Sequence, residues 1–303
     1  MEKYDAVIIG AGPCGIGAAI KLKEQGVNFA IIDGSTPGGK VNIAPRVDNY
    51  PGFKEIPGPD LAFKLFERLL DKGVSITGDN ILSLKKDKDL FILKGQYGEY
   101  AAKAVLIAVG TKERKLGLPK EDELFAHGLS YCALCDGHFF KGQDIAVIGG
   151  GNAALKEAIH LAGIAKKLYV IHRRNEFRGS NNLVNELKEM DNVEIITPYI
   201  PVEILGEDKV TGLVIENRED GSRRTLDIQG LFPLVGQLPN TGFVQIENVL
   251  DQWGTIPVNR MMETNVSGLF AGGDVLPRDI RQIYLAEHDG VVASKSIIEY
   301  LNK

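Results

Sequence analysis

The sequence predicts an α/β protein of two domains, one inserted into the other, and three observations carry this prediction. An apolar run, a glycine-rich turn and a helical segment follow one another twice, over residues 4–25 and 145–162. The 303 residues are enough for two domains of ordinary size. The last segment looks too short for a domain of its own and is expected to complete the first one. We therefore expect residues 1–113 and 243–303 to form a discontinuous domain and residues 114–242 to form the inserted one.

The first glycine-rich turn lies in a nucleotide-binding pattern. Two apolar runs, residues 4–9 and 29–32, predict buried parallel strands on either side of a helix over residues 15–25. The turn before the helix reads Gly10-x-Gly12-x-x-Gly15, and Asp33 ends the second strand. Such glycines let the backbone approach a pyrophosphate, the helix N-terminus stabilises its charge, and the acid accepts from a ribose hydroxyl. A plain turn is the alternative, but it does not explain the strand, helix, strand and acid in register.

The rest of the discontinuous domain is predicted from periodicity. Residues 37–52 form a turn-rich stretch, and irregular loops of this length are usually functional or disordered. The remaining predicted elements are a helix over 60–72, an antiparallel meander over 74–100, a strand over 104–109, a strand over 268–274 that runs into an acid, and a helix over 282–301.

The second glycine-rich turn, Gly149-x-Gly151-x-x-Ala154, follows a strand over 145–148 and opens a helix that ends at Ala162. A further strand over 168–171 ends at His172-Arg173-Arg174, with Arg178 four residues beyond. Arginines at this place favour a ribose 2′-phosphate, where an acid favours a free hydroxyl. The second site is therefore predicted to prefer NADPH to NADH; a solvated basic helix start is the alternative. Together the two patterns predict an α/β fold of two Rossmann-like, three-layer ββα domains.

A close cysteine pair, Cys132 and Cys135, lies between the two glycine-rich turns and is followed by Asp136. Two such cysteines can form a disulfide, and a thiolate there can attack another disulfide. Zinc is the main alternative, but it needs two more ligands, and the five histidines show no ligand spacing. The third cysteine, Cys14, lies inside the first glycine-rich turn, where we expect it to fill a small gap. We therefore expect a redox pair and no metal.

Composition excludes other classes of function. The net charge of −5 makes a nucleic-acid surface improbable. No apolar run approaches the roughly 20 residues that a membrane span needs, and the N-terminus has no signal-peptide organisation. We therefore expect no membrane or nucleic-acid partner and a cytoplasmic location. In that compartment a close cysteine pair is more often catalytic or metal-binding than structural.

The ordered set of motifs closely resembles the low-molecular-weight thioredoxin reductases of bacteria and archaea, which are flavoproteins with two dinucleotide-binding domains. The resemblance covers essentially the whole chain. Its motifs are the two glycine fingerprints, Gly38-Gly39, Asn49-Tyr50-Pro51-Gly52, Cys132-x-x-Cys135-Asp136-Gly137, His172-Arg173-Arg174-x-x-x-Arg178, Gly273-Asp274 and Arg281-Gln282.

The resemblance implies FAD in the discontinuous domain, NADPH in the inserted domain and a homodimer. The residues implied for FAD are Gly10, Gly12, Pro13, Gly15, Asp33, Gly38, Gly39, Lys40, Asn49, Gly110, Asp274, Arg281, Gln282 and Ile283. Those implied for NADPH are Gly149, Gly151, Asn152, Ala153, His172, Arg173, Arg174 and Arg178.

The same resemblance implies an NADPH-dependent thioredoxin-disulfide reductase, in which electrons pass from NADPH through FAD and the cysteine pair to a thioredoxin or thioredoxin-like protein. Cys135 is then the sulfur next to the flavin, Cys132 attacks the substrate disulfide, and Asp136 is the acid–base group. Two alternatives stay open: a ferredoxin-fed reductase or dithiol oxidase of the same family, and a non-catalytic flavoprotein sensor. The chain departs from the common family pattern at a few positions, which are Lys40, Leu134, Ala153 and Lys156.

Overall fold

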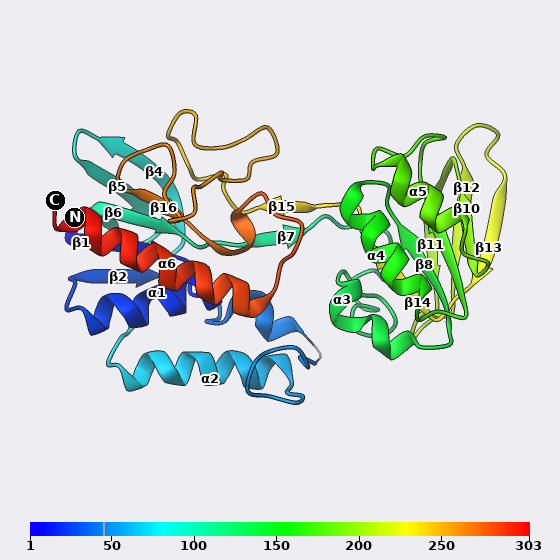
Figure 1. Cartoon of the computed structure of the whole chain (residues 1–303), viewed down its shortest axis with the longest axis horizontal. Helices are drawn as coiled ribbons and strands as arrows, with labels where there is room; N and C mark the ends of the chain where they lie inside the picture. The colour runs from blue at the N-terminus through cyan, green and yellow to red at the C-terminus, as the bar shows by residue number, and fades with distance from the viewer. Residues whose placement is uncertain (45) are drawn as a thin grey trace. The chain divides into compact units, whose positions relative to one another are not determined.

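The computed structural model describes residues 1–44 and 46–303, and these form two compact units (Figure 1). Unit 1 consists of residues 1–112 and 238–303, and unit 2 of residues 113–237. The second unit is therefore an insertion in the first. Both units combine helices with parallel sheets, as expected from the two repeated sequence patterns.

The boundaries of the units differ from the expected ones by one residue at the first crossing (112 against 113) and by five at the second (237 against 242). The two connecting strands, β7 (Thr111–Glu113) and β15 (Gln237–Pro239), pair with each other. Residues beyond β15 are already tied to unit 1, because Asn240 donates to the carbonyls of Gly110 and Val109. A long-range hydrogen bond of this kind leaves no local signal in the sequence.

A seven-stranded sheet forms the centre of unit 1, with the order β3-β2-β1-β6-β5-β4 and with β16 also paired to β6. Its strands are β1 (Glu2–Ile9), β2 (Phe29–Ile32), β3 (Ile76–Thr77), β4 (Ile81–Asp87), β5 (Leu90–Gly95), β6 (Glu99–Ile107) and β16 (Leu269–Ala271). The expectation of a meander ending at residue 100 and a separate strand starting at 104 is wrong. A single strand, β6, pairs antiparallel with β5 and parallel with both β1 and β16.

Side chains that alternate along the strands of unit 1 separate its two core layers. Along β1, Ala6 and Ile8 face one apolar cluster, and Val7 and Ile9 face the other. The first cluster includes side chains of the helices α1 (Pro13–Glu24), α2 (Gly58–Asp71) and α6 (Ile283–Leu301). The second includes β4, β5 and the segment 249–276. Two short 3₁₀ helices, η1 (Gly39–Ile43) and η3 (Gly273–Val275), complete the unit.

Unit 2 has a four-stranded parallel sheet of order β10-β9-β8-β14 and a three-stranded antiparallel sheet of order β11-β12-β13. Its strands are β8 (Asp144–Ile148), β9 (Lys167–Ile171), β10 (Val193–Ile196), β11 (Tyr199–Leu205), β12 (Gly212–Asn217), β13 (Arg223–Asp227) and β14 (Gly230–Pro233). Its helices are α3 (Ala133–Asp136), η2 (Gly137–Phe140), α4 (Asn152–Ala162) and α5 (Asn181–Lys188).

The parallel sheet of unit 2 lies between the antiparallel sheet and the helices α4 and α5. In β8, Ala146 and Ile148 belong to the apolar cluster shared with the antiparallel sheet. Ile145 and Val147 belong to the cluster shared with the two helices. This arrangement is the expected three-layer ββα domain. The sequence analysis missed α5, a helix of eight residues that begins after the N-cap Ser180.

No helix in the described part of the chain is both long enough and apolar enough to cross a membrane.

Candidate active site

The first glycine-rich turn joins the carboxyl end of β1 to the N-terminus of α1, and we call the space around this turn the first cradle. Gly10 has a φ of +104°, and a Cβ there would lie 2.5 Å from the Ala108 carbonyl oxygen, so no other residue fits. A Cβ added at Gly12 would meet no atom within 4 Å. The backbone around Gly12 is therefore open to a ligand, and the following helix begins with free N–H groups.

Most of the other residues implied for FAD lie close to one another around this cradle. The Gly38 amide donates to the Ala11 carbonyl over 2.8 Å. Lys40 donates to the Thr111 hydroxyl over 3.0 Å and lies 4.0 Å from the Asp274 carboxylate. Thr111, which the sequence analysis did not single out, thus holds in place Lys40, a residue predicted to bind FAD.

The C-terminal motif closes the same region. Arg281 donates through Nε to the Asp274 carbonyl over 3.3 Å. The Asn49 amide donates to the Gln282 side chain over 2.9 Å. The topology therefore brings together residues that lie more than 200 positions apart in the chain.

Asp33, predicted to bind a ribose hydroxyl, has a structural task as well. Its Oδ2 accepts from the Ala11 amide over 2.6 Å, and its Oδ1 accepts from the amide and the hydroxyl of Ser35. A carboxylate offers about four acceptor sites. Three of them are used here, so Asp33 both fixes the glycine-rich turn and keeps acceptor capacity for one more donor.

The second glycine-rich turn, between β8 and α4, repeats the cradle in unit 2. A Cβ added at Gly151 would meet no atom within 4 Å, as at Gly12. A Cβ at Gly150 would lie 2.3 Å from the His172 ring, so this imidazole packs directly on the turn. His172 is buried and stacks on Phe177, with ring centroids 4.9 Å apart. Burial, and to a smaller extent the neighbouring arginines, lower the pKa of His172.

The three predicted arginines are exposed around this second cradle. The chain carrying Arg178 bends back on the turn, since its amide donates to the Gly150 carbonyl over 2.9 Å. The Asn152 side chain accepts from the Ser180 amide over 2.7 Å and fixes the same bend. A fourth cation, Arg218, donates to the Arg173 carbonyl over 3.2 Å. The sequence analysis missed Arg218, because its contact depends on how β12 packs.

The cysteine segment, Ser130 to Gly137, carries the chemistry. Cys132 and Cys135 form a disulfide, with their Cα atoms 5.3 Å apart, and both residues are half-buried. Cys132 caps the short helix α3, and its Sγ accepts from the Cys135 amide over 3.1 Å. Asp136 follows directly and is buried, with 8% of its surface exposed.

Ser130, which the sequence analysis did not identify, connects Asp136 to the disulfide. Its hydroxyl donates to Asp136 Oδ2 over 2.5 Å. The Ser130 Oγ also accepts a hydrogen bond from the Cys132 amide over 3.1 Å. Ser130 therefore holds the Asp136 carboxylate and the backbone of the first cysteine in one arrangement.

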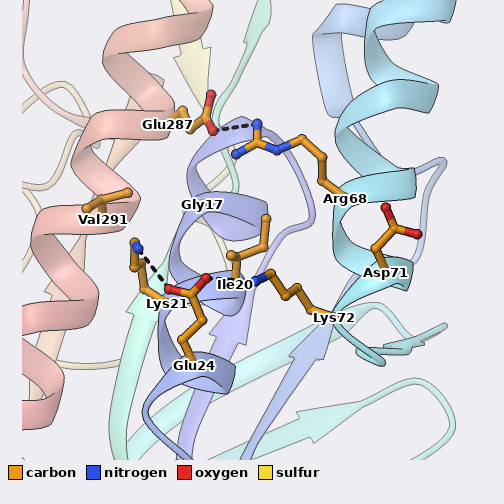
Figure 2. A pocket seen from close by; sticks show the side chains of 9 residues that line it. All are labelled: Gly17, Ile20, Lys21, Glu24, Arg68, Asp71, Lys72, Glu287 and Val291. Carbon is orange, nitrogen blue, oxygen red and sulfur yellow. Dashed lines mark hydrogen bonds and ion pairs between the residues drawn. The ribbon is translucent and has the colours of Figure 1, made fainter.

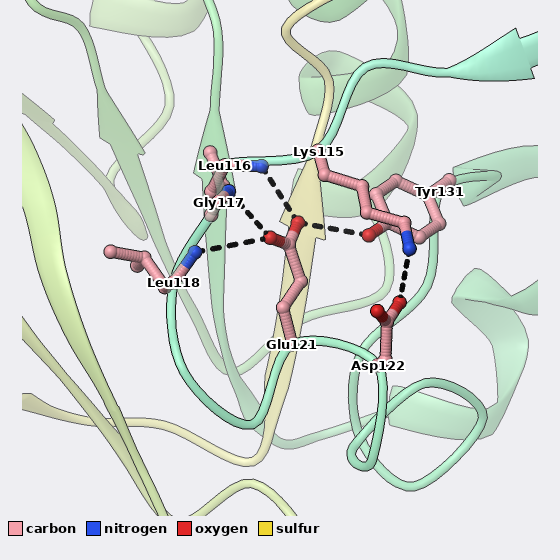
Figure 3. A network of polar contacts seen from close by, with 7 residues as sticks. All are labelled: Lys115, Leu116, Gly117, Leu118, Glu121, Asp122 and Tyr131. Atoms are coloured by element: carbon pink, nitrogen blue, oxygen red, sulfur yellow. Dashed lines mark hydrogen bonds and ion pairs between the residues drawn. The ribbon is translucent and has the colours of Figure 1, made fainter.

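A buried glutamate anchors the chain that leads into the cysteine segment (Figure 3). Glu121 accepts from the amides of Leu116 and Gly117, each over 2.8 Å, and from the Tyr131 hydroxyl over 2.9 Å. Burial, and then the hydrogen bond to Glu121, raise the pKa of Tyr131 well above its ordinary value. Tyr131 precedes Cys132, so this network fixes the start of the cysteine segment to the turn that follows β7.

The third cysteine has a packing role. Cys14 is buried as a free thiol, and a Cβ added at Gly272 would lie 2.7 Å from its sulfur. Burial raises the pKa of this thiol well above its ordinary value, which keeps it protonated. In residues 1–44 and 46–303, no group of three or more His, Cys, Asp or Glu side chains is arranged to hold a metal ion.

A separate hollow on unit 1 lies between α1, α2 and α6 (Figure 2). Five of the six charged residues that line it pair among themselves: Glu24 bridges Lys21 and Lys72, and Arg68 pairs with Glu287 over 2.8 Å. These pairs link the three helices at the surface.

Two Rossmann-like units, one of which carries a half-buried disulfide beside a buried carboxylate, define a disulfide oxidoreductase. Comparisons with known proteins agree with this class. The profile of the pyridine nucleotide-disulphide oxidoreductase family matches residues 4–290. The thioredoxin reductase of Mycoplasma pneumoniae is 42% identical over 300 residues, covering 98% of this chain and 95% of that protein.

Two further comparisons point the same way. The thioredoxin reductase of Bacillus subtilis is 35% identical over 301 residues, covering 99% of this chain and 95% of that protein. The crystal structure of thioredoxin reductase from Streptococcus pyogenes matches with a TM-score of 0.92 at 38% identity, covering 99% and 98% of the two chains. The chain therefore belongs to the pyridine nucleotide-disulphide oxidoreductase family and, within it, to the low-molecular-weight thioredoxin reductases.

The family assignment confirms the resemblance drawn from the motifs. It also confirms the prediction of two Rossmann-like domains and of a flavoprotein disulfide reductase that uses a pyridine nucleotide.

Proposed function

We propose that the protein is an NADPH-dependent flavoprotein, with FAD, that reduces the disulfide of a thioredoxin or thioredoxin-like protein. The observation that carries the proposal is the half-buried Cys132–Cys135 disulfide with the buried Asp136 directly beyond it. Two relatives named thioredoxin reductase match this chain over nearly their whole length, which supports thioredoxin as the substrate.

The residues around the first cradle suit FAD. The open space at Gly12 suits a pyrophosphate, and Lys40 and Arg281 supply cations near it. The remaining acceptor capacity of Asp33 suits a ribose hydroxyl. The Asn49–Gln282 pair offers amide groups that can orient a polar ring.

The residues around the second cradle suit NADPH. The open space at Gly151 repeats the pyrophosphate cradle of unit 1. Arg173, Arg174 and Arg178 are exposed beside it, and their guanidinium groups can bind a 2′-phosphate through charge-assisted hydrogen bonds. His172, packed on the turn, holds the chain from which the first two arginines project.

When bound, NADPH supplies a hydride and FAD relays its two electrons, so the protein's task is dithiol exchange. Two electrons and two protons convert the Cys132–Cys135 disulfide to two thiols. The Cys132 thiolate then attacks the substrate disulfide and forms a mixed disulfide, releasing one substrate thiolate. The Cys135 thiolate attacks the Cys132 sulfur, which releases the second substrate thiolate and restores the disulfide. Asp136, oriented by Ser130, moves protons between these thiols and the released groups.

An anaerobic titration of the purified holoenzyme with NADPH tests the proposal. The wild type should take up about two equivalents, since the disulfide and the flavin each accept two electrons. The matched Cys135→Ser variant should retain FAD, take up about one equivalent and lose turnover with thioredoxin. A single change of sulfur to oxygen thus removes one of the two electron acceptors.

The outcomes separate the competing functions. A flavin that stays oxidised with NADPH would favour a ferredoxin-fed enzyme or a dithiol oxidase. A flavin that is reduced while the disulfide persists would favour a sensor. Full thioredoxin turnover by Cys135→Ser would refute the proposal outright.

A further inference from the structure

A carboxylate from α4 contacts the backbone between the two cysteines. Glu157 is half-buried, and its Oε2 accepts from the amide of Ala133 over 2.9 Å. Ala133 is itself completely buried and follows Cys132 directly. The hydrogen bond therefore joins the face of α4 to the cysteine segment at the residue next to the predicted nucleophile.

This contact places a negative charge close to the Cys132 sulfur. The Ala133 nitrogen and the Cys132 Sγ are separated by only four covalent bonds, so the carboxylate lies within about 8 Å of the sulfur, one Debye length at physiological ionic strength. The Ala133 amide, a donor that could otherwise stabilise a thiolate, is given to the carboxylate instead. Both effects oppose ionisation of Cys132.

We propose that Glu157 is a positioning residue that makes the Cys132–Cys135 dithiol a stronger reductant by opposing the thiolate form of Cys132. When a protein stabilises the thiolate of a reduced cysteine pair, the reduced form is favoured and the disulfide of that pair is a stronger oxidant. Glu157 acts in the opposite direction. This inference rests on the proposed function in one respect: that function states that the dithiol passes its electrons to a substrate disulfide.

Other charged groups lie on α3 and on the two elements, η2 and α4, that contact it. Asp136 lies on α3 itself, His138 comes from η2, and Lys156 and His160 come from α4 beside Glu157. All four remain when Glu157 alone is changed. A difference between wild type and a Glu157 variant therefore reports the charge of Glu157 on an unchanged background.

The effect has a definite pH dependence. Reduction of the disulfide consumes two electrons and two protons, and both the disulfide and the neutral thiols carry no charge for Glu157 to act on. Only the thiolate form of Cys132 carries a charge that Glu157 can repel. The influence of Glu157 on the reduction potential therefore vanishes at pH values well below the pKa of the Cys132 thiol and reaches its full size well above it.

The test uses the holoenzyme with Glu157→Gln, whose amide oxygen can still accept from Ala133 while the charge is lost. In the reduced protein, alkylation of Cys132 by iodoacetamide is followed against pH by mass spectrometry of the peptide. The acid dissociation constant of the thiol should rise about tenfold. In dithiothreitol redox buffers, the fraction of free thiols should be unchanged at pH 6 and should shift toward the dithiol at pH 9, approaching tenfold or about 30 mV.

Two control variants sharpen the comparison. Glu207→Gln removes the same charge from an exposed loop of unit 2 and should leave both measurements as in the wild type. Glu157→Asp keeps the charge and should leave the thiol closer to the wild type than Glu157→Gln does. If Glu157→Gln fails to fold, the Asp variant compared with wild type under matched conditions still tests the sign, because its shorter side chain weakens the contact to Ala133.

An alkylation profile of Glu157→Gln that superimposes on the wild type overturns the inference. So does a potential that shifts equally at pH 6 and pH 9, because a change in packing and not in charge would produce it. Neither measurement uses NADPH or thioredoxin. A failed NADPH titration would therefore count against the proposed function and leave the role of Glu157 standing, and the reverse also holds.

Discussion

Replacing Glu121 with alanine should loosen the entry to the cysteine segment. Glu121 is buried, with 2% of its surface exposed, and its carboxylate is the common acceptor for three backbone amides and the Tyr131 hydroxyl (Figure 3). The substitution leaves these donors without their partner. Since Tyr131 precedes Cys132, the loss is expected to reach the redox pair as well as the turn at residues 115–118.

The size of the effect follows from the exposure of the three donors with short hydrogen bonds, of 2.8 to 2.9 Å, to the carboxylate. Gly117 is exposed, so water can replace the carboxylate at its amide at little cost. Leu116 and Tyr131 are half-buried, and a donor deprived of a charged acceptor costs about 1.5 kcal/mol at the low end of the range. The two together give about 3 kcal/mol, which corresponds to roughly a 100-fold change in a local opening equilibrium.

Hydrogen exchange measures this opening directly. The amides of Leu116 and Gly117 should exchange roughly 100-fold faster in Glu121→Ala than in the wild type, and alkylation of Cys132 in the reduced protein should also speed up. Glu123→Ala, an exposed glutamate two residues further along, should change stability by no more than about 0.5 kcal/mol. Unchanged protection of both amides would refute the assignment of Glu121 as the anchor.

Two further predictions concern the second cradle. Replacing Arg173 and Arg174 with alanine should raise the Michaelis constant for NADPH far more than that for NADH, since only NADPH carries the 2′-phosphate; equal changes would contradict the assignment. His172, whose pKa is lowered mainly by burial, should make the protein less stable as the pH falls below about 6.5, because there the unfolded chain binds a proton that the native imidazole does not. Urea unfolding at pH 7.5 and 5.5 should show this loss, at most about 1.4 kcal/mol per pH unit, in the wild type and not in His172→Gln; parallel profiles for the two proteins would count against it.

The sequence was sufficient to predict the two β-α-β units and the glycine-rich turns inside them, because these depend on local constraints. The positive φ at Gly10 and the open space at Gly12 admit few alternatives to glycine, so the pattern is visible in the chain. Buried parallel strands appear as short apolar runs for a similar reason, since both faces of the sheet are covered. The spacing of Cys132 and Cys135 likewise predicts the disulfide that the structure contains.

Tertiary structure decided which strands and helices meet, and the local pattern could not. The single strand β6 combines two predicted segments because it pairs with three neighbours, and pairing is a long-range property. The helix α5 was missed because eight residues give too little periodicity to stand out.

The sequence by itself determined the class of chemistry, through the glycine positions and the cysteine spacing. Only the tertiary structure showed which side chains hold the redox pair in place. Ser130 lies near it in sequence, but Glu157 reaches Ala133 across 24 residues and Glu121 reaches Tyr131 across 10. The physical reason is that a hydrogen bond between side chain and backbone depends on how two elements pack, whereas a turn or a close cysteine pair is fixed within its own few residues.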